Sequence, residues 1–228
     1  METKSMKESK IFQLKVWGEN ACFTRPEMKA ERVSYDVITP SAARAIFDAI
    51  LWIIHKIDIL KPILWESVRR NELGSKIAPQ NITQTMEAGT GNLALYIEEE
   101  RQQRAGLFLK DVSYILHASF KLTKRAGDGD SITKFEEMFK RRAEKGQCHH
   151  QPYFGNREFA AYFSLNDQTE KLIKIEQQDL GWMLYDLDFE DYDFDTKSYK
   201  DASPKFFRAE IQNGSIVIPD LNTNGARL

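Results

Sequence analysis

Phe12-Gln-Leu-Lys-Val-Trp17 opens the part of the chain that decides the fold, because apolar and polar residues alternate along it. Such alternation is typical of a β-strand with one buried face. After a loop, Thr39-Pro40-Ser41 predicts the start of a helix, since threonine can cap a helix and proline suits its first turn. Apolar residues then recur three or four positions apart, which predicts one buried helix face. They are Ala43, Ile46, Phe47, Ile50 and Ile54.

Further elements follow toward the C-terminus. The pattern predicts strands over 57–64, 109–122 and 159–165, a helix over 131–145, and a long polar excursion over about 68–104. An excursion of this length within a compact domain is usually functional or mobile. The order strand, helix, strand, excursion, strand, helix, strand is that of a ferredoxin-like βαββαβ unit, which also underlies RNA-recognition modules.

After Asn166 the pattern indicates strands only, over 182–189, 206–211 and 215–218. Asn213-Gly214 joins the last two and is a strong hairpin signal. The sequence therefore predicts an α+β fold. A ferredoxin-like (RRM-like) domain would occupy residues 1–165, and a small C-terminal antiparallel β extension would occupy residues 166–228.

The composition predicts a soluble cytoplasmic protein. Of the 228 residues, 42% are hydrophobic, enough for a core, and 29% are charged. Two cysteines, Cys22 and Cys148, fit a reducing compartment better than a disulfide framework. Residues 1–10 are polar and do not suggest a signal peptide, and no apolar run approaches the roughly 18 residues of a membrane helix.

Charge is unevenly distributed along the chain. The net charge is −2, which argues against a protein that coats nucleic acid with its whole surface. Residues 101–145 hold eleven Lys and Arg against six Asp and Glu, whereas residues 176–201 hold nine acids against two lysines. One face could therefore attract phosphate while another repels it, although two ordinary solvated faces would give the same counts.

The histidines are the first residues to consider for chemistry. His55 and His117 lie within apolar patterns, which favours a structural role in the core or at its edge. His149-His150 follows Cys148 in a loop, but adjacent ligands seldom point at one zinc ion. We therefore interpret His149 and His150 as a general base or an RNA-contacting pair.

An acidic segment, Asp186-Leu-Asp-Phe-Glu-Asp-Tyr-Asp-Phe-Asp195, could form a metal cluster for phosphodiester hydrolysis. Its alternation favours a strand with one solvated acidic face instead. Walker, Rossmann and nucleophile-elbow motifs are absent from the sequence. We expect no metal and no cofactor.

Basic residues gather in several loops and on the second helix. Near exposed aromatic residues such as Phe23, Tyr35 or Tyr153, they would suit single-stranded RNA, because guanidinium binds phosphate and rings stack on bases. Any one of them alone is more often an ordinary surface charge. The predicted RNA contacts are Arg25, Lys29, Arg32, Arg69, Arg70, Lys76, Arg101, Arg104, Arg141 and Arg142. Three further basic residues of the second helix, which are not among these contacts, are Lys134, Lys140 and Lys145.

Two adjoining motifs are specific enough to indicate a family. Val16-Trp-Gly-Glu-Asn-Ala-Cys-Phe-Thr-Arg-Pro-Glu-Met-Lys29 is followed by Glu31-Arg-Val-Ser-Tyr-Asp-Val-Ile-Thr-Pro-Ser-Ala-Ala-Arg44. Further segments of the same kind are Leu60-Lys-Pro-Ile63, Val68-Arg-Arg-Asn-Glu72, Arg101-Gln-Gln-Arg-Ala105, Phe139-Lys-Arg-Arg-Ala143, Arg157-Glu-Phe159 and Asp179-Leu-Gly-Trp-Met183. Together they make most of residues 12–218 resemble the fifth CRISPR-associated protein of type I-C systems, the Cas-five family of subtype d (also written subtype c).

This resemblance implies a ferredoxin-like domain with a β extension. It also implies that the chain binds the repeat hairpin of CRISPR precursor RNA, cuts it without a metal ion, and keeps the 5′ handle of the crRNA. The implied partners are this RNA, the backbone and large subunits of a Cascade assembly, and target DNA through the assembled complex, with no membrane. In the family the ribose 2′-OH attacks its own phosphate and leaves a 2′,3′-cyclic end.

At the family's catalytic positions this sequence differs. The usual tyrosine late in the first helix matches Leu51, and the usual Lys-His pair matches Lys134-Phe135, so the cation is kept and the imidazole is lost. Cleavage would then use Lys134 with a substitute such as His149, His150 or Tyr35, or Lys134 and positioning alone. The alternative is a non-catalytic subunit that only binds the 5′ handle.

Overall fold

The computed structural model describes residues 8–28, 30–47, 51–122, 126–127, 129–166, 170–188, 192–193, 198–199 and 203–220. Its helices are η1 (Pro26–Met28, a 3-10 turn), α1 (Pro40–Ile46), α2 (Pro79–Ala88) and α3 (Ile132–Glu144). Its strands are β1 (Phe12–Ala21), β2 (Leu51–Ile59), β3 (Leu64–Leu73), β4 (Arg101–Lys121), β5 (Tyr162–Leu165), β6 (Gln177–Asp188), β7 (Tyr192–Asp193), β8 (Ser198–Tyr199), β9 (Ser203–Gln212) and β10 (Ser215–Val217).

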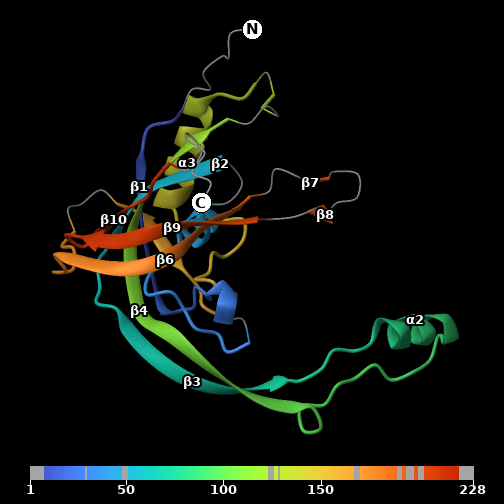
Figure 1. Cartoon of the computed structure of the whole chain (residues 1–228). Helices are drawn as coiled ribbons and strands as arrows, with labels where there is room; N and C mark the ends of the chain where they lie inside the picture. Colours follow the sequence, from blue (N-terminus) through green and yellow to red (C-terminus); the bar gives the residue numbers. More distant parts are fainter. Residues whose placement is uncertain are drawn as a thin grey trace.

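One antiparallel sheet of eight strands organises the described part of the chain. Its order is β5-β1-β4-β2-β10-β9-β6, and β3 pairs with β4 off this path. The long strand β4 is the centre of the arrangement, because its second half pairs with both β1 and β2 while its first half pairs with β3 (Figure 1). The short strands β7 and β8 form a separate pair.

The core lies between the sheet and the helices α1 and α3. Alternate side chains of β1, β2 and β4 point to the same face, where Phe120 contacts Phe12 and Trp52, and these two rings meet Phe139 of α3. The ring centroid of Phe139 lies 5.0 Å from that of Phe12 and 4.8 Å from that of Trp52. Aromatic contacts of this kind add to the stabilisation from burying apolar area. The helix predicted over 131–145 is therefore confirmed, within a residue at each end.

The first helix ends earlier, and the next strand begins earlier, than the sequence predicted. The apolar stripe was expected to continue the first helix to Ile54, but α1 ends at Ile46, and Ile54 pairs with Ala118 as part of β2. A short apolar run rich in isoleucine suits a buried strand as well as a helix, and periodicity alone does not separate the two. Ile50 lies outside the described residues. The strand predicted over 57–64 is wrong in its bounds for the same reason, since β2 covers Leu51–Ile59.

The predicted excursion over 68–104 is present, and it forms a hairpin arm. Strand β3 pairs with Arg101–Lys110 of β4 along its whole length, and α2 lies near the tip of the arm (Figure 1). None of the α2 residues is buried. The sequence indicated the polar character of this segment, but it did not reveal the cross-strand pairing that gives the arm its shape.

The C-terminal strands continue the same sheet. The hairpin predicted at Asn213-Gly214 is confirmed: both residues have positive φ (51° and 79°), and β9 and β10 flank them. Strand β10 also pairs with β2, which joins β9 and β6 to the rest of the sheet. Within the described ranges, no helix is long and apolar enough to cross a membrane.

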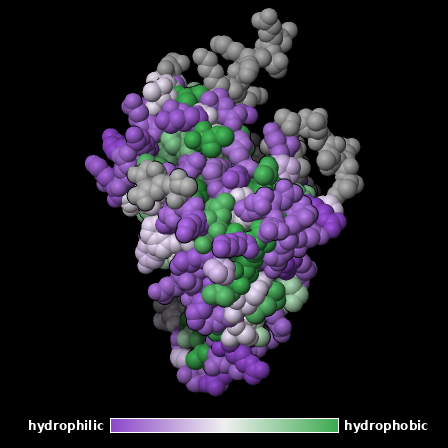
Figure 2. Space-filling model, turned by 90° about the vertical axis from the view of Figure 1, so that its left-hand side faces the viewer, coloured by the Kyte–Doolittle hydropathy of each residue, from purple (hydrophilic) through white to green (hydrophobic). Residues whose placement is uncertain are grey.

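One side of the molecule is mainly polar. Figure 2 shows hydrophilic residues over most of one side of the molecule, with hydrophobic patches between them. Several large apolar side chains are nevertheless exposed on strands, among them Trp17, Tyr162 and Trp182. Trp17 and Tyr162 stack on each other with their ring centroids 6.2 Å apart.

A buried polar cluster centred on Asp58 ties β2 to β4 and β10. Its carboxylate accepts a hydrogen bond from Ser215 Oγ at 2.6 Å and lies 2.7 Å from His117 Nε2 and 2.8 Å from Lys56 Nζ. Burial alone would raise the pKa of this carboxyl, but the hydrogen bonds from His117, Lys56 and Ser215 outweigh it and lower the pKa from 3.8 to about 2. His117 therefore has the structural role that its apolar surroundings predicted.

Because the pKa of Asp58 is lower in the folded protein than in the unfolded chain, its carboxylate stabilises the fold above about pH 4. This contribution disappears as the pH falls from about 4 to about 2. We expect Asp58→Asn to lower the free energy of unfolding by about 2 kcal/mol at pH 7 and by less at pH 3. Urea denaturation of the wild type and the variant at both pH values measures the change in the free energy of unfolding. Asp179→Asn, which removes an exposed carboxylate paired with Arg208, is the control and should change little. An equal loss at both pH values would contradict the assignment.

Candidate functional site

Tyr35 and Arg25 lie together in the loop between β1 and α1, and Tyr35 is buried. Only 2% of Tyr35 is exposed, and burial raises the pKa of its phenol above the ordinary value. The Arg25 guanidinium covers the ring at 4.5 Å from its centroid and binds Asp36 at 3.0 Å. The two side chains thus stabilise the loop, and the Tyr35 hydroxyl lies inside the protein.

Three more of the predicted RNA-contacting arginines hold the base of the arm to the rest of the molecule. Glu72 of β3 lies between Arg32 (3.4 Å) and Arg104 (3.6 Å), so it connects the first loop to both strands of the arm. Arg70 pairs with Glu158 at 2.5 Å. Its guanidinium also lies 4.9 Å from the ring centroid of Phe108. Much of the positive charge at this place is therefore neutralised within the protein.

The other predicted contacts are exposed. Within the described ranges they form no ion pair, and they divide into an arm group and an α3 group. The arm group is Arg69, Lys76 and Arg101, and the α3 group is Arg141 and Arg142. Lys29 lies outside the described residues.

The two groups lie on different elements of the molecule. Successive strand residues point to opposite faces, so Arg69 points away from the face on which its neighbour Arg70 is held by Glu158. The arm extends from one end of the sheet, and α3 packs near the other end (Figure 1). An RNA that contacts both groups would therefore reach from the arm to the last turn of α3.

Lys134 lies in the first turn of α3 and is half exposed. Its Nζ donates to Asp130 at 2.9 Å and to the carbonyl of Gly129 at 3.3 Å, and it lies 5.6 Å from the ring centroid of Phe135. Phe135 is partly buried and packs edge-to-face on Phe120 against the core, as its place in the apolar stripe predicted, and its other side lines a pocket. The side chain of Leu51 lies outside the described residues.

His149 and His150 lie in the loop after α3, with their ring centroids 4.2 Å apart. Together with Arg142 and Tyr153 they line a pocket of about 350 Å³ between α1, α3 and this loop. Two imidazoles and a guanidinium at one pocket provide a proton acceptor, a proton donor and a cation. These are the groups that general acid–base chemistry on a phosphodiester needs.

The predicted catalytic residues do not all share one site. Lys134 and Glu144 are ten residues apart in α3, which separates them by about 15 Å along the helix. His149 and His150 follow beyond that end, whereas Tyr35 is buried elsewhere. The structure thus brings the two histidines together with Arg142, and it places Lys134 at the opposite end of the same helix.

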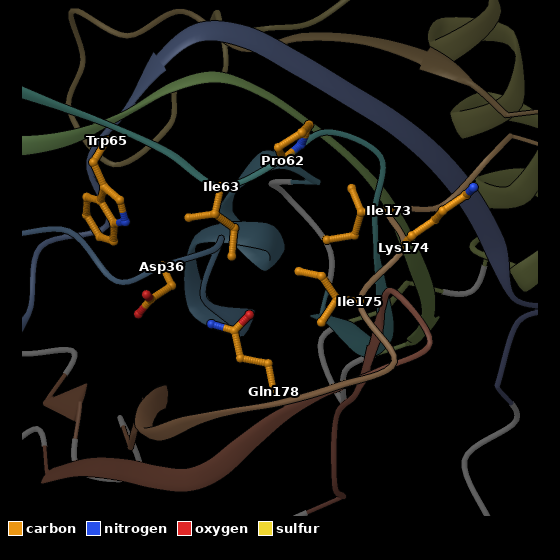
Figure 3. Close-up of a pocket in the computed structure, with 8 residues that line it drawn as sticks. All are labelled: Asp36, Pro62, Ile63, Trp65, Ile173, Lys174, Ile175 and Gln178. Carbon is orange, nitrogen blue, oxygen red and sulfur yellow. The ribbon is translucent and has the colours of Figure 1, made fainter.

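A second pocket, of about 450 Å³, lies between β6, the segment before it and the start of β3. Ile63, Ile173 and Ile175 point into it, while Lys174 points away (Figure 3). Its carboxylate, Asp36, is already held by Arg25. The pocket therefore has no carboxylate free for acid–base chemistry among the residues that line it.

The acidic segment 186–195 lies only partly within the described residues. Asp186 binds Arg44 of α1 at 2.6 Å, which gives it a structural contact. In the described part of the chain, no three His, Cys, Asp or Glu side chains are placed to hold a metal ion together.

Comparison with known proteins gives the family. A family model for Cas5d, described as CRISPR-associated protein (Cas_Cas5), matches residues 11–219. The chain belongs to this family. The resemblance inferred from the sequence motifs is thereby confirmed. A Cas5d relative from Mannheimia succiniciproducens is 50% identical over 91% of this chain and 94% of its own length, and one from Thermus thermophilus is 40% identical over 91% and 90%. Both relatives are named CRISPR pre-crRNA endoribonuclease Cas5d.

Two solved structures share the fold of this Cas5d family member. A crystal structure of a CRISPR-associated protein aligns over 96% of this chain and 97% of its own, with a TM-score of 0.64 and 19% identity. A functionally uncharacterized protein from Streptococcus mutans aligns over 97% of this chain and 98% of its own, also with a TM-score of 0.64 and with 18% identity. At these identities the comparison concerns the fold alone.

Proposed function

We propose that this protein binds CRISPR repeat RNA, cleaves it without a metal ion, and keeps the 5′ handle of the crRNA within a type I-C Cascade. The observation that carries the proposal is the 50% and 40% identity, over 91% of the chain, to two proteins named CRISPR pre-crRNA endoribonuclease. We place this activity in the cytoplasm.

The fold supports a ferredoxin-like RNA-binding module. The four strands β5-β1-β4-β2 stand in the spatial order expected for a βαββαβ unit whose third strand lies between the first and second. Helices α1 and α3 pack on one face of these strands. The strands β10, β9 and β6 then form the β extension, and the arm is an insertion between the second and third strands of the module.

The proposed reaction is an attack by the ribose 2′-OH on the adjacent phosphate. The 2′ oxygen forms a bond to phosphorus, the bond from phosphorus to the 5′ oxygen of the next nucleotide breaks, and a 2′,3′-cyclic phosphate remains. One imidazole of the pair His149 and His150 takes the 2′-OH proton, and the other gives a proton to the leaving 5′ oxygen. Arg142, at the same pocket, stabilises the negative charge on the phosphorane.

Arg141 and the exposed cations of the arm would bind phosphates away from the cut, while Arg142 acts at the cut itself. In the assembled Cascade, the projecting arm and its α2 tip offer surface for the backbone and large subunits, because none of the α2 residues is buried within this chain. Target DNA would be met only through the assembled complex.

The alternative is a subunit that binds the 5′ handle without cutting. Phe135 favours it, because an apolar, packed side chain stands where the family resemblance implies histidine. Incubation of the purified protein with its repeat RNA in EDTA separates the two functions. A single product with a 2′,3′-cyclic end supports the enzyme, and retained intact RNA supports the binding subunit. Activity that EDTA abolishes would indicate a metal nuclease and contradict both.

RNA binding should depend on the exposed cations rather than on the paired ones. We expect the triple variant Arg69→Gln, Lys76→Gln, Arg101→Gln to weaken repeat binding and to reduce the slope of log Kd against log salt. The slope should fall by about 0.7 for each phosphate that the variant no longer neutralises. Fluorescence anisotropy at several salt concentrations measures both quantities. Lys61→Gln, which removes a cation paired with Asp111, is the control. An unchanged slope in the triple variant would exclude the arm as a phosphate-binding surface.

A further inference from the structure

The pocket beside His149 and His150 has a feature that proton transfer does not require. Its inner wall is aromatic: Phe47, Trp52 and Phe139 line it, and the ring centroids of Phe47 and Trp52 are 4.5 Å apart. Its volume of about 350 Å³ is at the small end of the range for ligand pockets. Such a space suits one planar ring system rather than a large ligand.

Trp52 leaves a buried hydrogen-bond donor unsatisfied in this wall. The residue is 2% exposed, and its indole Nε1 has no hydrogen-bond partner among the residues that the structure describes. An unpaired buried donor is costly, because the group has lost its bond to water and gained none in return. Nε1 is itself covered, so a ligand acceptor reaches it only when the Trp52 ring shifts toward the cavity, and that hydrogen bond would remove the cost.

The mouth of the pocket, unlike its aromatic inner wall, is formed by exposed basic and polar residues. Arg142, His149 and His150 are exposed there, and Tyr153 is 41% exposed beside them. A ligand that matches both parts must have a flat apolar body, an acceptor at its inner edge, and a negative charge close to the mouth. A nucleobase joined through its ribose to a phosphate meets these three requirements.

We propose that this pocket receives one unpaired nucleobase of the repeat RNA, turned out of the stack and placed against the aromatic wall, and that a shift of the Trp52 ring toward the cavity lets a carbonyl acceptor of the base bond the indole N–H. This inference rests on the proposed function and deepens it. The bound base would fix the position of the RNA, and the phosphate beside its ribose would then lie next to His149 and His150. Trp52 is in this scheme a positioning residue for the cut.

An abasic scan of the repeat RNA tests the proposal. In the wild-type protein, removing the base at one unpaired position should weaken binding by about fivefold to 150-fold, the range expected for loss of a stacked base. Trp52→Phe keeps an aromatic ring but removes the donor. We expect this variant to bind the intact repeat less tightly and to be less sensitive to the missing base at that same position. Trp182→Phe, at an exposed tryptophan of β6, is the matched control and should behave as wild type.

Photo-crosslinking tests the same contact without a substitution in the core. Repeat RNA with 5-iodouridine at one unpaired position at a time is irradiated with the wild-type protein, and the attached peptide is identified by mass spectrometry. A crosslink to Phe47, Trp52 or Tyr153 from the base-sensitive position supports the pocket, even if Trp52→Phe fails to fold. Crosslinks only to other parts of the chain overturn it.

Binding and cleavage of the unmodified repeat RNA distinguish a failure of the pocket assignment from a failure of the proposed function. If the protein binds and cleaves it, but neither the scan nor the crosslinks single out a base at this pocket, the pocket assignment alone is wrong. If the protein does not bind the repeat at all, the proposed function is wrong and the pocket assignment falls with it.

Discussion

Replacing both histidines, His149→Ala with His150→Ala, is expected to lower the rate of repeat RNA cleavage by about 10²–10⁴-fold. Their ring centroids are 4.2 Å apart at the mouth of the pocket, so one imidazole can accept the 2′-OH proton while the other protonates the leaving oxygen. The double variant prevents one histidine from replacing the other. Both side chains are exposed, so the fold should be unaffected. Single-turnover cleavage with excess protein measures the chemical step, and anisotropy shows whether binding is kept.

Comparing the cleavage rate of Lys134→Ala with that of the double histidine variant locates the cut, because Lys134 lies at the other end of α3. With the cut at the histidine pair, Lys134→Ala should lower the cleavage rate by less than about tenfold, as expected for removal of one exposed cation distant from the reacting phosphate. Lys140→Ala, on the same helix and paired with Glu144, controls for the change in positive charge. If Lys134→Ala abolished cleavage and the double histidine variant did not, the cut would lie at the start of α3, where the family resemblance places its catalytic pair.

The parts of the fold that local sequence determines were the parts that could be predicted. Ser131 accepts a hydrogen bond from the Lys134 backbone N–H and caps α3, and Asn213-Gly214 supplies the positive φ of its hairpin. The helix–strand boundary near Leu51 could not be predicted, because an isoleucine-rich run becomes a strand through its pairing with β4. The pairing that turns residues 68–104 into an arm is equally non-local.

The candidate site also depends on non-local contacts that the sequence does not reveal. The sequence indicated which residues carry charge, but not which of them form ion pairs within the protein. Arg70 and Glu158 are 88 residues apart, so nothing in the local sequence distinguishes Arg70 from its exposed neighbour Arg69. The orphaned indole of Trp52 has no sequence signal at all, since it follows from how α1, α3 and the loop around His150 pack. The family resemblance, more than any local pattern, connected this part of the chain to RNA.

Gly155 determines how the loop with His149 and His150 attaches to the sheet. Just before it, the Phe154 carbonyl accepts a hydrogen bond from the Cys22 backbone N–H at 3.0 Å. Gly155 itself has φ of +81°, and a Cβ built there would lie 1.9 Å from the Cys22 carbonyl oxygen. That clash is with backbone, which cannot rotate away as a flexible side chain would. The backbone on both sides is fixed, because Cys22 follows β1 directly and Phe154 is fully buried.

Gly155→Ala should therefore lower the free energy of unfolding by more than about 3 kcal/mol, since a left-handed backbone penalty of about 1–2 kcal/mol adds to a backbone clash. Gly146→Ala is the matched control: Gly146 also has positive φ (+61°), but a Cβ at this position would meet no other part of the described protein within 4 Å, apart from its neighbours in the chain. It should cost only the backbone penalty of about 1–2 kcal/mol. Urea denaturation of the two variants measures the difference. Because the clash can be relieved only by moving the loop away from Cys22, any folded Gly155→Ala protein should also lose cleavage, whereas Gly146→Ala should retain it. Equal stability of the two variants would mean that the loop is not held against Cys22 as described.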